Sequence, residues 1–173
     1  MKLKIFPFKK VKSTNSTAIR LINQNIKFGV VTSERQYKGR GQGTNRWISN
    51  YGNIFLSIFF PIKRNLSIKK ITKINLNVVK KVIKKHINEK INIKLPNDIL
   101  INQSKICGIL QEIIFKNNIK YIIIGIGINL NNSPIIPNYC TSYLNKYSKK
   151  NIKKLELIKE LKKNFEKKIE NFV

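Results

Sequence analysis

The chain has 173 residues, a formal net charge of +27 at neutral pH, one histidine and two cysteines. This length fits one domain with a sizeable core. No apolar run is long enough to span a membrane and no signal-peptide core follows Met1, so we expect a cytoplasmic protein without a membrane partner. The cysteines, Cys107 and Cys140, lie far apart, and their spacing predicts neither a disulfide framework nor a zinc site.

Lysine, isoleucine and asparagine make up 85 of the 173 residues, as expected if an A/T-biased coding sequence has pushed surface positions towards lysine. The basic residues are spread along the whole chain, and few aromatic residues interleave with them as single-strand binding requires. A basic nucleic-acid-binding protein remains an alternative of another class. We expect no specific nucleic-acid partner.

The first elements are a strand over residues 2–12 and a helix that begins in the run of cap-forming residues at 13–17. Ser13, Thr14 and Asn15 open this run. Their side chains have two interpretations: plain capping of the helix, or lining of a small-molecule pocket.

The stretch from Gln36 to Trp47 lies between strands predicted at 28–33 and 48–60, and it holds three alternate glycines, two arginines and the only tryptophan. Glycines let backbone N–H groups approach an anion, and the guanidinium groups of Arg40 and Arg46 match phosphate or carboxylate. The stretch has no Gly-Lys-Ser/Thr ending and precedes a strand, so it is neither a P-loop nor a Rossmann fingerprint. We predict a phosphate-handling lid, with a simple glycine-rich turn as the alternative.

A long amphipathic helix is predicted over residues 67–86, because apolar residues recur there at steps of three and four. The stretch 91–102 then alternates up to Lys94, turns at Pro-Asn-Asp, and resumes as a strand. Lys94 therefore lies at a strand end. Asp98, the only aspartate, follows the turn, and an ordinary turn aspartate is its alternative interpretation.

Two further strands, 105–115 and 121–131, follow turns at 102–104 and 117–118. Three glycines inside these strand patterns indicate bulges or the floor of a pocket: Gly108, Gly125 and Gly127. Glu112 is a candidate buried, paired acid, and an outward-facing strand residue is the equal alternative. A final helix should dock on the sheet through Ile158, Leu161, Phe165, Ile169 and Phe172.

Taken together, these stretches resemble the biotin–protein ligases, also called biotin–acetyl-CoA-carboxylase ligases. Residues 13–15 are similar to the family's Ser-Thr-Asn, and 36–47 resemble its Gln-x-x-Gly-Arg-Gly-Arg loop with a following Trp. Residues 94–98 resemble Lys-Trp-Pro-Asn-Asp, 105–112 resemble Lys-x-x-Gly-Ile-Leu-x-Glu, and 125–131 resemble Gly-x-Gly-Ile-Asn-x-Asn. The matches are collinear and cover nearly the whole chain.

This resemblance implies an α+β fold, a mixed and largely antiparallel sheet packed by helices, as in the class II biotin/lipoyl ligase catalytic domain. Residues 1–173 would form one such domain, with neither an N-terminal helix-turn-helix nor a C-terminal SH3-like domain. The implied reaction joins biotin and ATP, with Mg²⁺, to biotinyl-5′-AMP and pyrophosphate. The biotinyl group then passes to a lysine of the biotin carboxyl carrier domain of acetyl-CoA carboxylase or a related carboxylase. Whether the chain forms a homodimer stays open.

Carried over residue by residue, the resemblance implies catalytic roles for Lys94 and Arg40, with Lys94 holding the biotin carboxylate and the adenylate phosphate. The implied biotin-binding residues are Ser13, Thr14, Asn15, Gln36, Gly39, Arg40, Gly41, Gln42, Lys94 and Gly108. The implied ATP- and adenylate-binding residues are Arg40, Gln42, Trp47, Lys94 and Asn129. Asp98 and Glu112 would support the site, and no side chain is assigned to a metal.

One departure concerns Gln42, because the family more commonly has a second loop arginine there, at a position tied to retention of the adenylate. We therefore expect this chain to release biotinyl-adenylate more readily than its relatives. The nearest enzyme alternative is a lipoate ligase or octanoyl transferase of the same architecture, with Cys107 as a thioester nucleophile. No histidine lies near Cys107 in the sequence to activate it.

Overall fold

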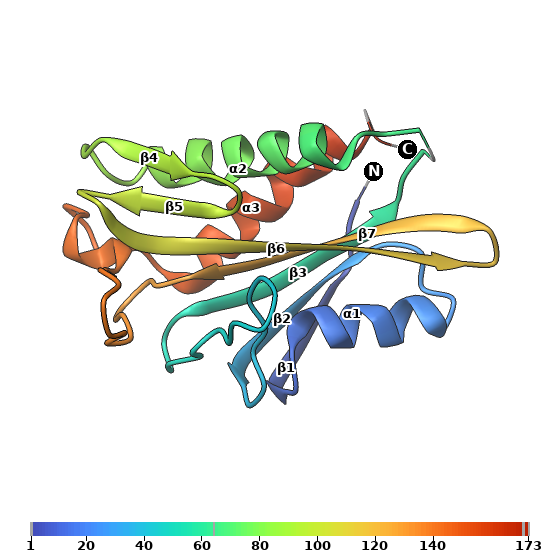
Figure 1. The fold of residues 1–173 in the computed structure, drawn as a ribbon, viewed down its shortest axis with the longest axis horizontal. Helices are drawn as coiled ribbons and strands as arrows, with labels where there is room; N and C mark the ends of the chain where they lie inside the picture. Colours follow the sequence, from blue (N-terminus) through green and yellow to red (C-terminus); the bar gives the residue numbers. More distant parts are fainter. Residues whose placement is uncertain (1, 64, 171, 173) are drawn as a thin grey trace.

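Alternating apolar strands build one mixed sheet in the computed structural model, which describes residues 2–63, 65–170 and 172 (Figure 1). The strands are β1 Ile5–Val11, β2 Gly29–Gln36, β3 Ile54–Pro61, β4 Ile91–Lys94, β5 Asp98–Ile101, β6 Ser104–Lys116 and β7 Ile119–Ile128. The helices are α1 Thr14–Asn23, α2 Ile68–Lys84 and α3 Lys154–Ile169, with a short 3-10 helix at Leu144–Lys146. The predicted α+β class is confirmed.

The strand order across the sheet is β1-β2-β3-β7-β6-β5-β4. Only β1 and β2 pair in parallel, and α1 connects them; every other neighbouring pair is antiparallel. The two tight hairpins have the predicted asparagine turns, because Asn102-Gln103 and Asn117-Asn118 all adopt positive φ. The predicted largely antiparallel sheet is therefore present.

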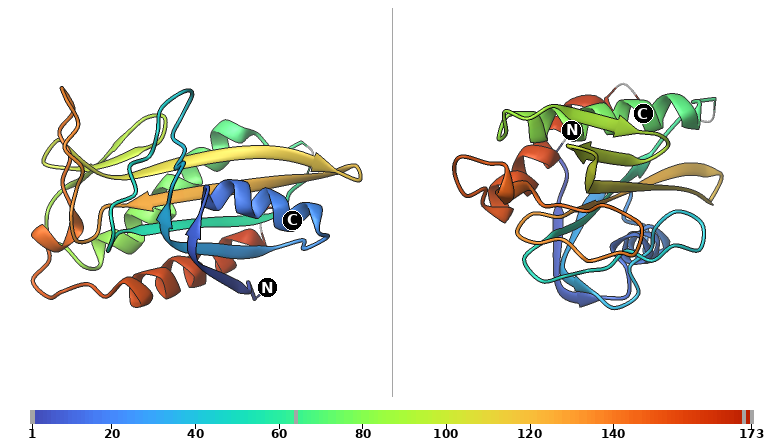
Figure 2. Two further views of the ribbon diagram at one scale, coloured as in Figure 1. Left: turned by 90° about the horizontal axis from the view of Figure 1, so that it is seen from below. Right: turned by 60° about the vertical axis from the view of Figure 1, so that its left-hand side comes forward.

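Strand β7 shows how the sheet separates its two faces (Figures 1 and 2). Its even-numbered isoleucines from Ile122 to Ile128 join the larger core, which α2 and α3 cover. On the opposite face Tyr121 and Ile123 pack in the smaller core under α1. Towards the end of β7 the same face continues with Gly125, which lies under Asn15 of α1, and Gly127, which lies under Trp47. The end of β7 itself therefore contributes no side chain to this face.

Each helix lies where its apolar stripe can be buried. Ser13 caps α1 by accepting a hydrogen bond from the backbone N–H of Ser16 at 3.5 Å, and Ser67 caps α2 in the same way. The lysines of α2 lie mainly on its solvent side, opposite a buried row that includes Ile71, Val78 and Val82. Within the described residues no helix combines the length and apolar character that crossing a bilayer requires.

Several predicted boundaries were wrong. Strand β2 continues to Gln36 beyond the predicted end at 33, and β7 ends at Ile128 instead of 131. The strand expected over 48–60 begins only at Ile54, because a turn at Tyr51-Gly52 precedes it and Gly52 has a φ of +86°. The Asn53 side chain then accepts the backbone N–H groups of Leu130 and Asn131 at 2.9 and 3.1 Å, which ties the start of β3 to the end of β7. Phe172 lies beyond α3, yet it is buried and stacks on Phe60 with ring centroids 6.1 Å apart.

Replacing Lys116 by methionine should lower the free energy of unfolding by about 1–2 kcal/mol. The ammonium group donates to the carbonyl oxygens of Ile22 and Asn23 at 2.8 and 2.6 Å, and to Oδ1 of Asn25 at 2.7 Å. It thus caps the C-terminus of α1 with a positive charge. Urea unfolding measures the loss. The matched change Lys163→Met, at an exposed position of α3, should change stability by only a few tenths of a kcal/mol, and an equal loss there would contradict the capping role.

Candidate functional site

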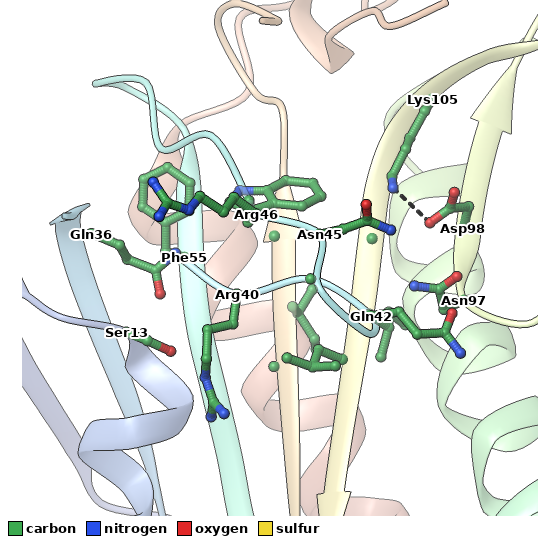
Figure 3. A pocket seen from close by; sticks show the side chains of 18 of the residues that line it. Ser13, Gln36, Arg40, Gln42, Asn45, Arg46, Phe55, Asn97, Asp98 and Lys105 are labelled. Atoms are coloured by element: carbon green, nitrogen blue, oxygen red, sulfur yellow. Dashed lines mark ion pairs between the residues drawn. The ribbon is translucent and has the colours of Figure 1, made fainter. Parts of the chain in front are cut away.

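A cavity of about 440 Å³ lies on the α1 face of the sheet, over the bare end of β7 (Figure 3). Its wall comes from the start of α1, from the end of β2 and the glycine-rich loop that follows it (residues 37–53), from strands β3, β6 and β7, from the start of β5, and from the segment 136–139. The predicted site residues that line it are Ser13, Thr14, Asn15, Gln36, Arg40, Gly41, Gln42, Trp47, Asp98 and Gly108. Most of the predicted set therefore meets in one place, although it comes from four separate stretches.

The floor of the cavity is a patch of glycines on which the only tryptophan lies. Gly108 and Gly127 are register partners in β6 and β7, and the indole of Trp47 packs directly on both. A Cβ at Gly108 would be 2.7 Å from ring atom Cζ3, and one at Gly127 would overlap Cε2. Both positions therefore exclude a side chain because the ring needs the space. The predicted pocket floor has this form, with Trp47 as part of the wall.

A polar wall closes the end of the cavity next to α1. The Gln36 side-chain oxygen accepts the Thr14 backbone N–H at 2.8 Å, and its amide nitrogen donates to Ser49 Oγ at 3.1 Å. On the neighbouring strand Ser57 Oγ lies 2.8 Å from Thr14 Oγ1 and 2.5 Å from Asn15 Oδ1. These amides and hydroxyls hold one another in fixed orientations. The wall can therefore recognise a small uncharged ring that carries both donors and acceptors.

A cation lies at the other end, on the far side of Figure 3 from Ser13 and Gln36. Lys105 Nζ is 2.8 Å from Asp98 Oδ1, and Tyr139 donates its hydroxyl to Asp98 Oδ2 at 2.7 Å. The ammonium also lies 5.4 Å from the ring centroid of Trp47 and 5.6 Å from that of Tyr139. Burial and the hydrogen bond to Asp98 raise the pKa of Tyr139 to about 12, so it remains a donor at neutral pH.

A β-bulge turns Lys105 towards the cavity. Asp98 pairs with Gly108 and Ile99 with Cys107, but Leu100 pairs with Lys105, so Ile106 is an extra residue in β6. Strict alternation from Gly108 would place Lys105 on the other face with Cys107. The extra residue reverses that alternation, and Lys105 shares the cavity face with Asp98 and Gly108.

Lys94, predicted as the central cation, is not among the described residues that line this cavity. It is the last residue of the edge strand β4 and pairs with Asp98 of β5, so it lies on the cavity face of the sheet, one strand further from the cavity than Asp98. Lys94 is exposed, and its Nζ lies 5.1 Å from the ring centroid of Tyr139. Lys94 thus stands next to Tyr139, which lines the cavity, and its role in holding the substrate stays a prediction. Lys105 is a second cation on the same face of the sheet.

Three other predicted residues also lie outside the main cavity. Gly39 and Glu112 line a second cavity of about 440 Å³ that adjoins the glycine-rich loop. Asn129 is buried, and its side chain donates to the Ser142 carbonyl oxygen at 3.1 Å. Its Oδ1 has no hydrogen-bond partner among the described residues. One interpretation made Glu112 a buried, paired acid. It is paired, with Oε2 2.5 Å from Arg40 Nη2, but its side chain is 25% exposed and so only partly buried.

The two arginines of the loop lie directly opposite each other, because Arg40 and Arg46 form an antiparallel bridge. Two like charges that face each other across paired strands destabilise the pairing unless an anion lies between or near them. Both side chains line the main cavity. The loop therefore brings two permanent positive charges to the wall of the main cavity, one of which, on Arg40, is paired with Glu112. Guanidinium groups suit an anionic ligand.

Neither a nucleophile nor a built-in metal site emerges from these residues. Cys107 is fully buried on the opposite face of β6, and burial raises the pKa of its thiol, so it offers no thiolate. Among the described residues no three His, Cys, Asp or Glu side chains gather to hold a metal ion. The nearby carboxylates, Asp98 and Glu112, are each paired with a cation.

Sequence reasoning missed several parts of the wall, among them Phe55, Asn97, Lys105 and Tyr139. Asn97 and Lys105 stand inside stretches that were already recognised as motifs. For Lys105 the missing signal was the bulge, which alternation alone does not reveal. Tyr139 lies in an irregular segment after Pro134 where no periodicity places a side chain.

Known proteins resemble this chain in both sequence and fold. The "Bifunctional ligase/repressor BirA" of Bacillus subtilis is 35% identical over 130 residues, which are 72% of this chain and 39% of that protein. The chain thus matches well under half of that relative's length. Biotin protein ligase from Leishmania major, solved in complex with biotinyl-5-AMP, superposes with a TM-score of 0.81 at 22% identity, over 98% of this chain and 76% of that one.

A more distant neighbour is P. falciparum LipL1, solved in complex with lipoate, with a TM-score of 0.64 at 16% identity over 97% of this chain and 62% of that one. Identities this low show a common fold only. The sequence model of one family, however, matches residues 7–129, which include the start of α1, the glycine-rich loop, Lys105 and the glycine floor. The chain therefore belongs to the biotin/lipoate A/B protein ligase family.

Proposed function

We propose that this chain activates biotin with ATP to biotinyl-5′-AMP and then transfers the biotinyl group to a lysine of a carboxylase carrier domain. One observation carries the proposal: a single cavity joins a fixed polar wall, an apolar floor and a cationic end under an arginine-bearing loop. These features match the three parts of biotin, which are an uncharged ureido ring, an apolar chain and a carboxylate. The 35% identity to a ligase/repressor supports the same function.

In this proposal the ureido ring binds at Ser13, Thr14 and Gln36, whose hydrogen-bonding groups are already oriented. The valeryl chain lies against the indole of Trp47, which covers Gly108 and Gly127. Its carboxylate then reaches the cationic end, where Lys105 stands between two aromatic rings. Substrate positioning of this kind brings the carboxylate oxygen to the α-phosphate without a protein nucleophile.

The two reacting groups are both anions, so the enzyme must offset their repulsion. Lys105 would stabilise the negative charge that develops on the α-phosphate as the carboxylate attacks and pyrophosphate leaves. Arg40 and Arg46 would bind phosphate oxygens from the loop, and Gln42 would add hydrogen bonds without charge. Mg²⁺ would enter bound to the triphosphate and neutralise part of it. The closed loop would keep water away from the mixed anhydride until the carrier lysine attacks it.

Pyrophosphate exchange tests the adenylation step directly. The purified protein is incubated with Mg²⁺, ATP and labelled pyrophosphate, in parallel with biotin, lipoate and octanoate. Exchange that depends on biotin is the expected result, and subsequent labelling of an isolated biotin carrier domain would support the transfer step. Exchange with lipoate alone would replace biotin by lipoate as substrate, and no exchange with any acid would refute an adenylating function.

A further inference from the structure

Glu112 holds the glycine-rich loop from below through one carboxylate oxygen. Its Oε2 contacts Arg40 Nη2 at 2.5 Å and accepts from Asn15 Nδ2 at 2.7 Å. Asn15 also donates to the Leu110 carbonyl oxygen at 3.2 Å and accepts from Ser57, so it is fixed to the sheet. A chain of contacts thus connects the start of α1, strand β6 and the loop. Glu112 is its central member.

Arg40 is shared between two places. It lines the main cavity and also the second cavity, where Glu112, Lys12 and Lys38 lie. In Figure 3 its guanidinium points away from Lys105 and Asp98, so it is turned from the cationic end of the main cavity. A guanidinium that turns to an anion in the main cavity would give up contact with Glu112.

We propose that Glu112 is a positioning residue that serves as the internal counter-anion of Arg40, holding the loop in place until a substrate anion takes over the guanidinium. The exchange needs little energy. The Arg40 and Glu112 side chains are 39% and 25% exposed, so their attraction is strongly screened. When Arg40 leaves, Glu112 keeps its hydrogen bond from Asn15 and the nearby positive charges of Lys12 and Lys38. This inference rests on the proposed function only for the identity of the anion.

The variant Glu112→Gln keeps the shape of the side chain and an acceptor for Asn15 but removes the charge. It separates two roles of Glu112: competing with the substrate anion for Arg40, or only orienting Arg40 for that anion. If Glu112 competes for Arg40, the dissociation constants of ATP and of inorganic pyrophosphate, measured by calorimetry, should fall by about 2- to 5-fold. If Glu112 only orients Arg40 for its ligand, binding should weaken. Glu156→Gln on α3 makes the same change in net charge away from the loop, so it corrects for general electrostatics.

Two further measurements complete the test. In an Arg40→Ala background the effect of Glu112→Gln should disappear, because no guanidinium remains to compete for. In the ligand-free protein, acrylamide should quench the fluorescence of Trp47 more strongly in Glu112→Gln than in wild type, since the loop loses its tether. Weaker or unchanged anion binding relative to Glu156→Gln, or unchanged quenching, would overturn the inference. Failure of the wild-type protein to bind ATP would instead count against the proposed function, and the quenching result would still decide the tether.

Discussion

Replacing Lys105 by alanine is expected to reduce biotin-dependent pyrophosphate exchange by about 10²- to 10³-fold, the usual loss when one donor to a developing charge is removed. The structure gives Lys105 this importance because its ammonium faces the cavity between Trp47, Tyr139 and Asp98. Lys105→Arg keeps the charge but not the compact geometry, so it should recover part of the activity. The measurement is exchange rate against ATP and biotin concentration.

Lys94→Ala is the matched control, because Lys94 lies on the same face one strand further out and is exposed. Its loss should change the exchange rate less than about 10-fold, through the weakened local positive potential alone. The reverse ranking, with Lys94→Ala nearly inactive and Lys105→Ala active, would contradict the assignment and restore the first prediction from sequence. In Lys105→Ala, Asp98 loses its ion pair but keeps the hydrogen bond from Tyr139. A thermal melt of each variant checks that the protein remains folded.

The contrast between these lysines shows where sequence patterns stopped being sufficient. Helical spacing, asparagine turns and alternation predicted most elements, because each is a local signal of backbone conformation. They also offered a pocket floor as one of two explanations for Gly108, Gly125 and Gly127, with bulges as the other. That Lys105 faces the cavity as well could be seen only from the register of β5 against β6. That register depends on the bulge at Ile106, which no local pattern in the sequence marks.

The pairing of Arg40 with Glu112 illustrates the same limit at longer range. Seventy-two positions separate the two residues, and nothing near either of them identifies the partner. The sequence only offered Glu112 as paired or outward-facing. The sheet resolves this choice because β6 carries Gly108, Leu110 and Glu112 along one face, and the loop that follows β2 folds over that face.

Gly127→Ala should displace Trp47 from the floor of the cavity and weaken binding of the acid substrate by about tenfold or more. The new methyl group would occupy the space of the indole ring, and overpacking of this kind costs about 1–3 kcal/mol. Since the ring belongs to a loop, it can move away more easily than the strand can. Trp47 is the only tryptophan, so a red shift of the intrinsic fluorescence reports its exposure to water without interference.

Gly125→Ala separates this effect from a general disturbance of β7. Gly125 lies two residues earlier on the same face, and a Cβ there would meet the side chain of Asn15, not the tryptophan. We therefore expect Gly125→Ala to leave the emission wavelength unchanged while it disturbs the polar wall through Asn15 and Ser57. Equal red shifts in both variants would mean that the strand itself had moved. If the emission wavelength of Gly127→Ala is unchanged and the variant binds biotin normally, the indole does not lie on the glycine floor in solution.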